Sequence, residues 1–313
     1  MNRGVTLAAI ALGTAIAAGC VSVNLRTAPQ PLKETPISGE GRDKILLIDI
    51  AGFISGERRG GGVLGVGEQR PSMVSEIAEV VRTAERDKQI KGVILRINSP
   101  GGTVTASDTI YHELAAYKQR TQVPMTAQIL DLGASGAYYI AQVADRIVAQ
   151  PTTITGSIGV IMVRPSVTGL LDKLGVQAEQ ITSGTYKGMG SPLTPMRDDE
   201  RAIFQTVIDD LYTRFVATVV AGRPHLAPER IAALADGRIY TAQQAKETGL
   251  VDDIGYLQDS IEALKRTAKL DRATVVTYTR TGDYQGSVYA GPVVNVDLGV
   301  SPAHSGFLYL WQP

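Results

Sequence analysis

The chain has 313 residues, 44% of them hydrophobic and 20% charged, so it can bury a large core and is not a disordered chain. Its 31 Lys and Arg residues balance its 31 Asp and Glu residues without long like-charge runs, which argues against a nucleic-acid-binding protein. Cys20 is the only cysteine, which excludes an internal disulfide. The three histidines, His112, His225 and His304, lack the spacing of a zinc site, so no metal is expected.

The N-terminal segment has the pattern of an export signal. The uncharged stretch Val5–Ala18 is too short to span a bilayer but suits a signal-peptide hydrophobic region. It ends in Ala-Ala-Gly-Cys, which resembles the lipobox of bacterial lipoproteins, although Ala17 stands where leucine is usual. We expect residues 1–19 to be a signal peptide and Cys20 to be acylated, with simple secretory cleavage or an uncleaved anchor as the alternatives.

The body of the chain has the pattern of an α/β protein. Residues 20–43 are expected to form a tether, stiffened by three prolines within Thr27–Pro36. From Lys44 onward, short apolar runs alternate with helical patterns, which predicts a largely parallel sheet covered by helices. The tail, residues 271–313, is expected either to add strands or to form an assembly contact.

The predicted elements follow one another along the chain. The strands expected from Val- and Ile-rich runs are Ile45–Ile50, Gly92–Ile97, Met125–Ile129, Ile147–Ala149, Ile158–Met162 and Gln177–Ile181. The helices expected from three- and four-residue apolar spacing are Met73–Arg86, Ser107–Tyr117, Gly136–Val143, Val167–Leu174 and Asp198–Ala221.

The first segment that suggests chemistry is the turn Asn98-Ser99-Pro100-Gly101-Gly102 at the end of a predicted strand. Glycines let backbone N–H groups approach a bound group closely, and open α/β sheets bind ligands at the carboxyl ends of their strands. Such amides can form one half of an oxyanion hole. A Pro-Gly-Gly turn is also a common tight connection, so this segment alone does not decide.

The second segment is Gly133-Ala134-Ser135-Gly136-Ala137, in which one hydroxyl stands among residues too small to shield it. Ser135 at the start of the predicted helix would lie beside the unpaired N–H of Gly136, and both this amide and the helix dipole would favour an oxyanion. A serine at this place can equally be an ordinary helix N-cap.

A nucleophilic serine needs a base, and the lack of a nearby histidine leaves lysine or a carboxylate. Lys187 is the only charged residue in the ten-residue segment Ser183–Pro192. A lysine acts as a base at pH 7 only when desolvation favours its neutral form, which an uncharged pocket can provide. An ordinary surface lysine would show the same local sequence.

Together with Thr155–Val160, these segments occur in the order seen in the signal peptide peptidase family of the serine-lysine type, which the chain resembles from about Lys44 to Lys265. The resemblance implies a peptidase domain, assigned to residues 44–270, with a fold like the Clp protease and the crotonases. It implies an acyl-serine intermediate and no metal or organic cofactor.

The resemblance also assigns roles to individual residues. Ser135 matches the nucleophile and Lys187 the general base. The amides of Gly102 and Gly136 match the oxyanion hole, and Ser157 is the residue expected to orient the lysine.

The same resemblance suggests how the protein is placed and what it cleaves. Single-repeat members of the family form homo-oligomeric rings in which the lysine of one subunit can serve the serine of its neighbour. We therefore expect a ring, held at the bacterial cell envelope through Cys20 or a signal anchor with its catalytic domain exported. The expected substrates are signal-peptide remnants, other hydrophobic peptides or membrane-protein segments.

Two other functions fit parts of the pattern. A crotonase-like acyl-thioester enzyme shares the glycine-rich turns but would be cytoplasmic and does not need both Ser135 and Lys187. A non-catalytic envelope scaffold lipoprotein would not need either residue.

Overall fold

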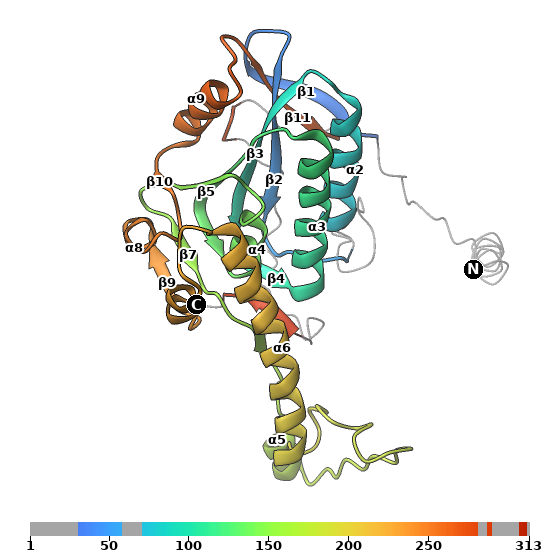
Figure 1. Ribbon diagram of the computed structural model, residues 1–313. Helices are drawn as coiled ribbons and strands as arrows, with labels where there is room; N and C mark the ends of the chain where they lie inside the picture. Colours follow the sequence, from blue (N-terminus) through green and yellow to red (C-terminus); the bar gives the residue numbers. More distant parts are fainter. Residues whose placement is uncertain (1–30, 58–70, 281–286, 290–306, 312–313) are drawn as a thin grey trace, which may run out of the picture. The chain divides into compact units, whose positions relative to one another are not determined.

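The computed structural model describes residues 31–57, 71–280, 287–289 and 307–311, which Figure 1 shows in colour. The predicted signal peptide, Cys20 and the first part of the predicted tether lie outside the described residues. Among the described helices, none combines the length and hydropathy needed to cross a lipid bilayer.

The elements have the following bounds. The strands are β1 Lys33–Gly39, β2 Lys44–Ala51, β3 Ile90–Ser99, β4 Gly101–Thr103, β5 Met125–Ala134, β6 Arg146–Ala149, β7 Ile154–Gly156, β8 Ile161–Met162, β9 Ile239–Thr241, β10 Asp253–Ile254, β11 Thr274–Thr279 and β12 Phe307–Leu310. The helices are α2 Met73–Arg86, α3 Val104–Thr121, α4 Gly136–Ala141, α5 Thr168–Leu174, α6 Asp198–Gly222, α7 Pro228–Leu234, α8 Ala242–Thr248 and α9 Leu257–Thr267.

The main sheet has the predicted α/β organisation. Its strands lie in the order β1-β11-β2-β3-β5-β6-β10, and β7 pairs with both β5 and β9. The pairs from β11 to β10 along this order are all parallel, and β1 joins β11 antiparallel. Helices α2 and α3 lie on one face of the sheet and α9 lies on the other (Figure 1).

The alternation of side chains along β2 shows why both faces need a cover. Ile45 and Leu47 pack in one cluster with Leu257 and Ile261 of α9, whereas Leu46 and Ile48 belong to the cluster on the other face. A strand covered on both faces reads as a continuous apolar run, which is why the sequence predicted this strand correctly.

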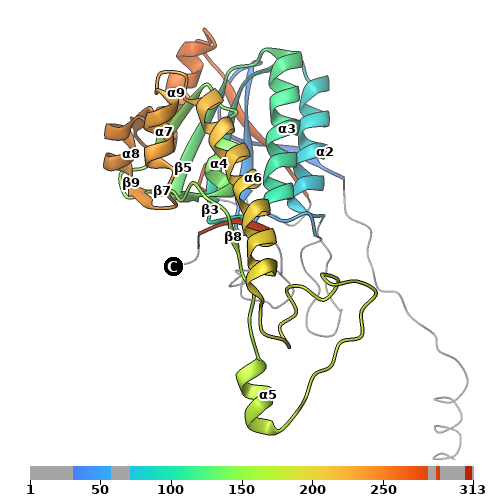
Figure 2. The ribbon, with the colours of Figure 1, turned by 60° about the horizontal axis from the view of Figure 1, so that its bottom comes forward.

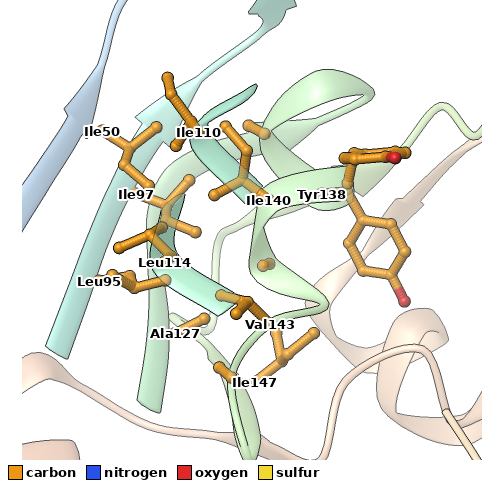
Figure 3. Packing of buried hydrophobic residues seen from close by; sticks show 14 of the residues in the cluster. Ile50, Leu95, Ile97, Ile110, Leu114, Ala127, Tyr138, Ile140, Val143 and Ile147 are labelled. Carbon is orange, nitrogen blue, oxygen red and sulfur yellow. The ribbon is translucent and has the colours of Figure 1, made fainter. Parts of the chain in front are cut away.

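The larger cluster lies between the sheet and helices α3 and α4. Figure 3 shows Leu95 and Ile97 of β3 facing Ile110 and Leu114 of α3, with Ile140 of α4 beside them. All five side chains are buried completely. This packing fixes α4, and with it the turn that precedes α4, against the ends of the central strands.

Replacing Ile110 by alanine is expected to lower the free energy of unfolding by about 2–5 kcal/mol, because the lost methyl groups leave a cavity in a packed core. Urea unfolding followed by circular dichroism measures this change. Gln119→Ala, on an exposed position of the same helix, is the control and is expected to stay within about 0.5 kcal/mol. Equal effects of the two substitutions would contradict this account of the core.

Two regions differ from the prediction. Part of the stiff spacer expected at Thr27–Pro36 is a strand from Lys33 onward, because a partner from the tail, β11, lies beside it with Thr35 opposite Thr277. The tail therefore adds a strand to the main sheet. The peptidase boundary at 44–270 stays a prediction, but the sheet includes strands from both flanks of it.

The strand predicted at Gln177–Ile181 is wrong. It falls in residues 163–197, here called the arm, which include α5. Together with the first turns of α6, the arm projects from the sheet (Figures 1 and 2). Ile181 is 96% exposed, and no strand among the described residues pairs with this segment. An isolated strand leaves its backbone groups unpaired, so an apolar run alone does not make one here.

Candidate active site

Ser135 lies at the junction of β5 and α4, where the chain turns sharply from strand to helix. Its φ of 53° and ψ of −117° are unusual for a residue with a side chain, and such strain is typical of turns that present a nucleophile. The Ser135 N–H donates to the carbonyl of Gly156 over 2.8 Å, which fixes the turn to β7. Helix α4 follows directly with Gly136 as its first residue, as the sequence predicted.

The hydroxyl of Ser135 is enclosed and unpartnered. The residue is 1% exposed, and its Oγ has no hydrogen-bond partner within the part of the chain that the structure describes. The side chain also makes no capping bond to α4. Ser135 therefore does not act as an ordinary side-chain N-cap, which was one of the two interpretations of the sequence. A buried hydroxyl without a partner is costly, and such groups cluster at reactive sites.

The glycine turn predicted at the end of β3 lies against this serine. Gly101 has a φ of 101°, and a Cβ built on it would lie 2.8 Å from the amide nitrogen of Gly136. The Oγ of Ser99 accepts from the Gly101 N–H over 3.0 Å and donates to the carbonyl of Gly52. The turn is thus locked by Ser99, a residue that the sequence did not single out.

The hydrogen bonds between this turn and Ile54 show which way the N–H of Gly102 is directed. The carbonyl of Gly101 and the N–H of Thr103 both bond to Ile54, at 2.9 Å each. Because successive residues of an extended chain direct their backbone groups to opposite sides, the N–H of Gly102 faces away from Ile54. The structure therefore brings together three of the predicted site residues, Ser135, Gly102 and Gly136.

Lys187 lies apart from this group. It is an exposed residue of the arm, held in a turn by a hydrogen bond from its N–H to the carbonyl of Gly184. Ser157 follows β7 with a φ of 51°, and its N–H donates to the carbonyl of Arg238 over 2.8 Å. Within the described residues of one chain, no hydrogen bond joins Lys187 to Ser135 or to Ser157.

Aromatic side chains form a wall beside the serine turn. Tyr139, one helical turn after Ser135, packs edge-on against Tyr111 and Phe215, with ring centroids 5.4 and 5.2 Å apart. Burial, and then the hydrogen bond from its hydroxyl to Asp108, raises the pKa of Tyr139 to about 12. Arg214 of α6 forms an ion pair with the same Asp108 carboxylate. The wall stays uncharged at neutral pH.

Among the described residues, no group of three or more His, Cys, Asp or Glu side chains could hold a metal ion. The backbone N–H of Gly136 and the glycine turn of Gly101 and Gly102 lie beside Ser135. Two amides and a hydroxyl suit acyl transfer, in which negative charge develops on a carbonyl oxygen during attack.

Replacing Gly136 by alanine is expected to lower kcat by about 10- to 100-fold, because the new methyl group must displace the serine turn and its amide. A Cβ built on Gly136 would lie 2.3 Å from the Oγ of Ser107. The double substitution Gly136→Ala with Ser107→Ala removes that obstacle and should restore part of the rate. Peptide hydrolysis measures both, and a Gly136→Ala protein with normal kcat would contradict the role of this amide.

Family comparisons fit this geometry. A model described as peptidase family S49 matches residues 117–271, and one described as Clp protease matches residues 62–157. A protein of Enterococcus faecium provisionally named signal peptide peptidase SppA is 36% identical over 246 residues, which cover 79% of this chain and 70% of that protein.

Two longer relatives are matched over part of their length. The serine protease SPPA, chloroplastic, of Arabidopsis thaliana is 31% identical over 272 residues, covering 86% of this chain and 39% of that protein. Protease 4 of Salmonella typhi is 35% identical over 213 residues, covering 67% of this chain and 34% of that protein. The chain thus spans little more than a third of these two proteins.

Proposed function

Because the chain belongs to peptidase family S49 and is a serine peptidase, we propose that it cleaves hydrophobic peptides, such as signal-peptide remnants or membrane-protein segments, with Ser135 as nucleophile and Lys187 as base. The observation that carries this proposal is the buried, unpartnered hydroxyl of Ser135 on a strained turn, with the turn of Gly102 and the amide of Gly136 beside it.

The proposed reaction follows acyl-transfer chemistry. A neutral Lys187 takes the proton of Ser135, whose oxygen attacks the peptide carbonyl carbon. The N–H groups of Gly102 and Gly136 stabilise the oxyanion of the tetrahedral intermediate, and the lysine then gives the proton to the leaving amine. Water hydrolyses the acyl-enzyme in a second round with the same groups.

The position of Lys187 supports a base donated by a neighbouring subunit. The arm exposes a series of apolar side chains that one chain leaves uncovered: Val163, Leu170, Leu174, Val176, Ile181 and Leu193. Exposed apolar surface of this kind is typical of a protein–protein contact. Packing of the arm against a second copy would both cover these side chains and remove water from the lysine. We propose a ring in which each arm completes the site of its neighbour.

The N-terminal pattern supports a tether at the cell envelope. Acylation of Cys20 after cleavage would leave two or three acyl chains, each contributing about 0.8 kcal/mol per buried methylene, which is enough for stable anchoring. The catalytic domain would then lie outside the cytoplasm, near hydrophobic segments released into the membrane.

A Cys20→Ser protein is expected to lose its lipid and move from the membrane fraction to the soluble exported fraction. Metabolic labelling with a radioactive fatty acid and cell fractionation measure this change. Val21→Ser, next to the predicted acylation site, is the control and should keep the lipid. Lipid incorporation into the Cys20→Ser protein would contradict the tether.

Hydrolysis of a peptide copied from a signal-peptide hydrophobic region tests the proposed function. The full chain should cleave it, and Ser135→Ala should lower kcat by about 10⁴- to 10⁶-fold. Ser38→Ala, at an exposed position on β1, is the matched control and should keep full activity. Cleavage that persists in Ser135→Ala would remove Ser135 from the mechanism. Cleavage of charged peptides alone would contradict the hydrophobic substrate class.

A further inference from the structure

Strand β5 is irregular just before it reaches the serine turn. Ile97 of β3 lies opposite Ile129, but Ser99 lies opposite Gly133, so two steps along β3 correspond to four steps along β5. The additional residues of β5 form a β-bulge. Bulges bend a strand and redirect the residues that follow, and they are over-represented next to active sites.

The bulge also moves β5 from one neighbouring strand to another. Up to Ile129, β5 pairs with β6, whereas from Leu132 onward it pairs with β7. The bond from the Ser135 N–H to the carbonyl of Gly156 continues this second pairing. The position of the nucleophile therefore depends on the bulge, because only the segment after it lies beside β7.

Asn98, which lies between Ile97 and Ser99 on β3, bonds to the bulge through its side chain. The N–H of Leu132 donates to Oδ1 of Asn98 over 3.2 Å. The backbone carbonyl of Asn98 accepts instead from the N–H of Gly52, over 3.0 Å, on the side of β3 that faces β2. The side chain thus supplies the acceptor that the backbone of Asn98 does not offer to the bulge.

This hydrogen bond joins the two segments that form the proposed oxyanion hole. Asn98 lies in the segment that leads into the turn of Gly102, and Leu132 lies three residues before Ser135. The separation of these segments sets the distance between the amides of Gly102 and Gly136. An oxyanion is stabilised only where both donors reach it, and a misplacement of about 1 Å can cost about 100-fold in rate.

We propose that Asn98 is a positioning residue of the reaction, because its Oδ1 holds the bulge of β5 at the distance from the glycine turn that the oxyanion requires. It acts through the serine turn and is not itself a catalytic residue. This inference rests on the proposed peptidase function and adds a residue to it. From the sequence, only the glycines of the segment Asn98–Gly102 had an expected role.

Two substitutions of similar size isolate this hydrogen bond in the full chain. Asn98→Leu removes the acceptor and is expected to lower kcat for the hydrophobic peptide by about 10- to 100-fold, with KM within about twofold, because the geometry matters in the transition state. Asn98→Asp keeps an oxygen acceptor and should keep kcat within about threefold. Asp131→Leu makes a matched change at an exposed position of the bulge and should keep the wild-type kcat.

Backbone amide exchange followed by mass spectrometry measures the bond without an activity assay. A fragment that contains Leu132 should exchange about tenfold faster or more in Asn98→Leu than in the wild type, and at the wild-type rate in Asn98→Asp. Fragments of α2 should exchange equally in all of them. Faster exchange throughout the protein would contradict a local role. If Asn98→Leu fails to fold, Asn98→Ala, which also lacks the acceptor, takes its place.

The outcomes separate this inference from the peptidase function. A wild-type kcat in the folded Asn98→Leu protein, or an equal loss in Asn98→Asp or Asp131→Leu, would overturn the inference and leave the peptidase function intact. A wild-type chain that is folded and assembled but hydrolyses no peptide would overturn the peptidase function, and the inference with it.

Discussion

Replacing Lys187 by alanine is expected to lower kcat by about 10³- to 10⁴-fold with little change in KM, because a general base acts in the transition state and not in substrate binding. The rate that remains should keep rising with pH as hydroxide replaces the base. Steady-state hydrolysis of the hydrophobic peptide from pH 6 to 10 measures both effects.

Lys173→Ala is the matched control, since Lys173 is an exposed lysine of the same arm on α5. It should keep the wild-type kcat and pH profile. A Lys187→Ala protein that forms the same oligomer and retains most of its kcat would contradict the role of this lysine. Another base would then have to be sought near Ser135.

Mixing two inactive proteins is expected to restore activity if the lysine comes from a neighbour. In rings assembled at random from equal amounts of Ser135→Ala and Lys187→Ala subunits, about a quarter of the interfaces join an intact serine to an intact lysine. Co-expression of the two variants should therefore give about a quarter of the wild-type activity per site. We expect this result because Lys187 lies on an exposed arm, whereas Ser135 lies in a buried turn. No hydrogen bond joins the two residues within the described chain.

The control is co-expression of Ser135→Ala with the double variant Ser135→Ala and Lys187→Ala, which contains no intact serine and should stay inactive. Failure of the first mixture to regain activity, although mixed rings form by mass, would show that each chain uses its own lysine.

The central part of the fold could be predicted because its signals are local. α2 was predicted at its observed bounds, since five buried residues recur at helical spacing after a serine cap. β2, β3 and β5 contain their predicted strands because a sheet covered on both faces requires unbroken apolar runs. The expected strand at Gln177–Ile181 was wrong because strand formation needs a partner, and a sequence pattern does not show whether one is near.

The serine turn could be predicted for a similar reason. Small residues around Ser135 and two glycines after β3 restrict what the backbone can do locally, and the structure brings both turns together. The pairing of β12 with β4 could not be predicted, because Tyr309 and its partner Gly102 are some two hundred residues apart in the chain. The apolar, aromatic run Phe307–Trp311 was the only signal, and it fits either a strand or an assembly contact.

The identity of the nucleophile is tested most directly by locating a covalent adduct. The full chain is incubated with a fluorophosphonate until labelling is complete, digested, and the modified residue is found by tandem mass spectrometry. The account predicts one adduct, on Ser135, and none in the Ser135→Ala protein. An adduct on Ser99 or Ser157 in place of Ser135 would contradict it, because both hydroxyls lie near the turn but neither is on the strained strand-to-helix junction.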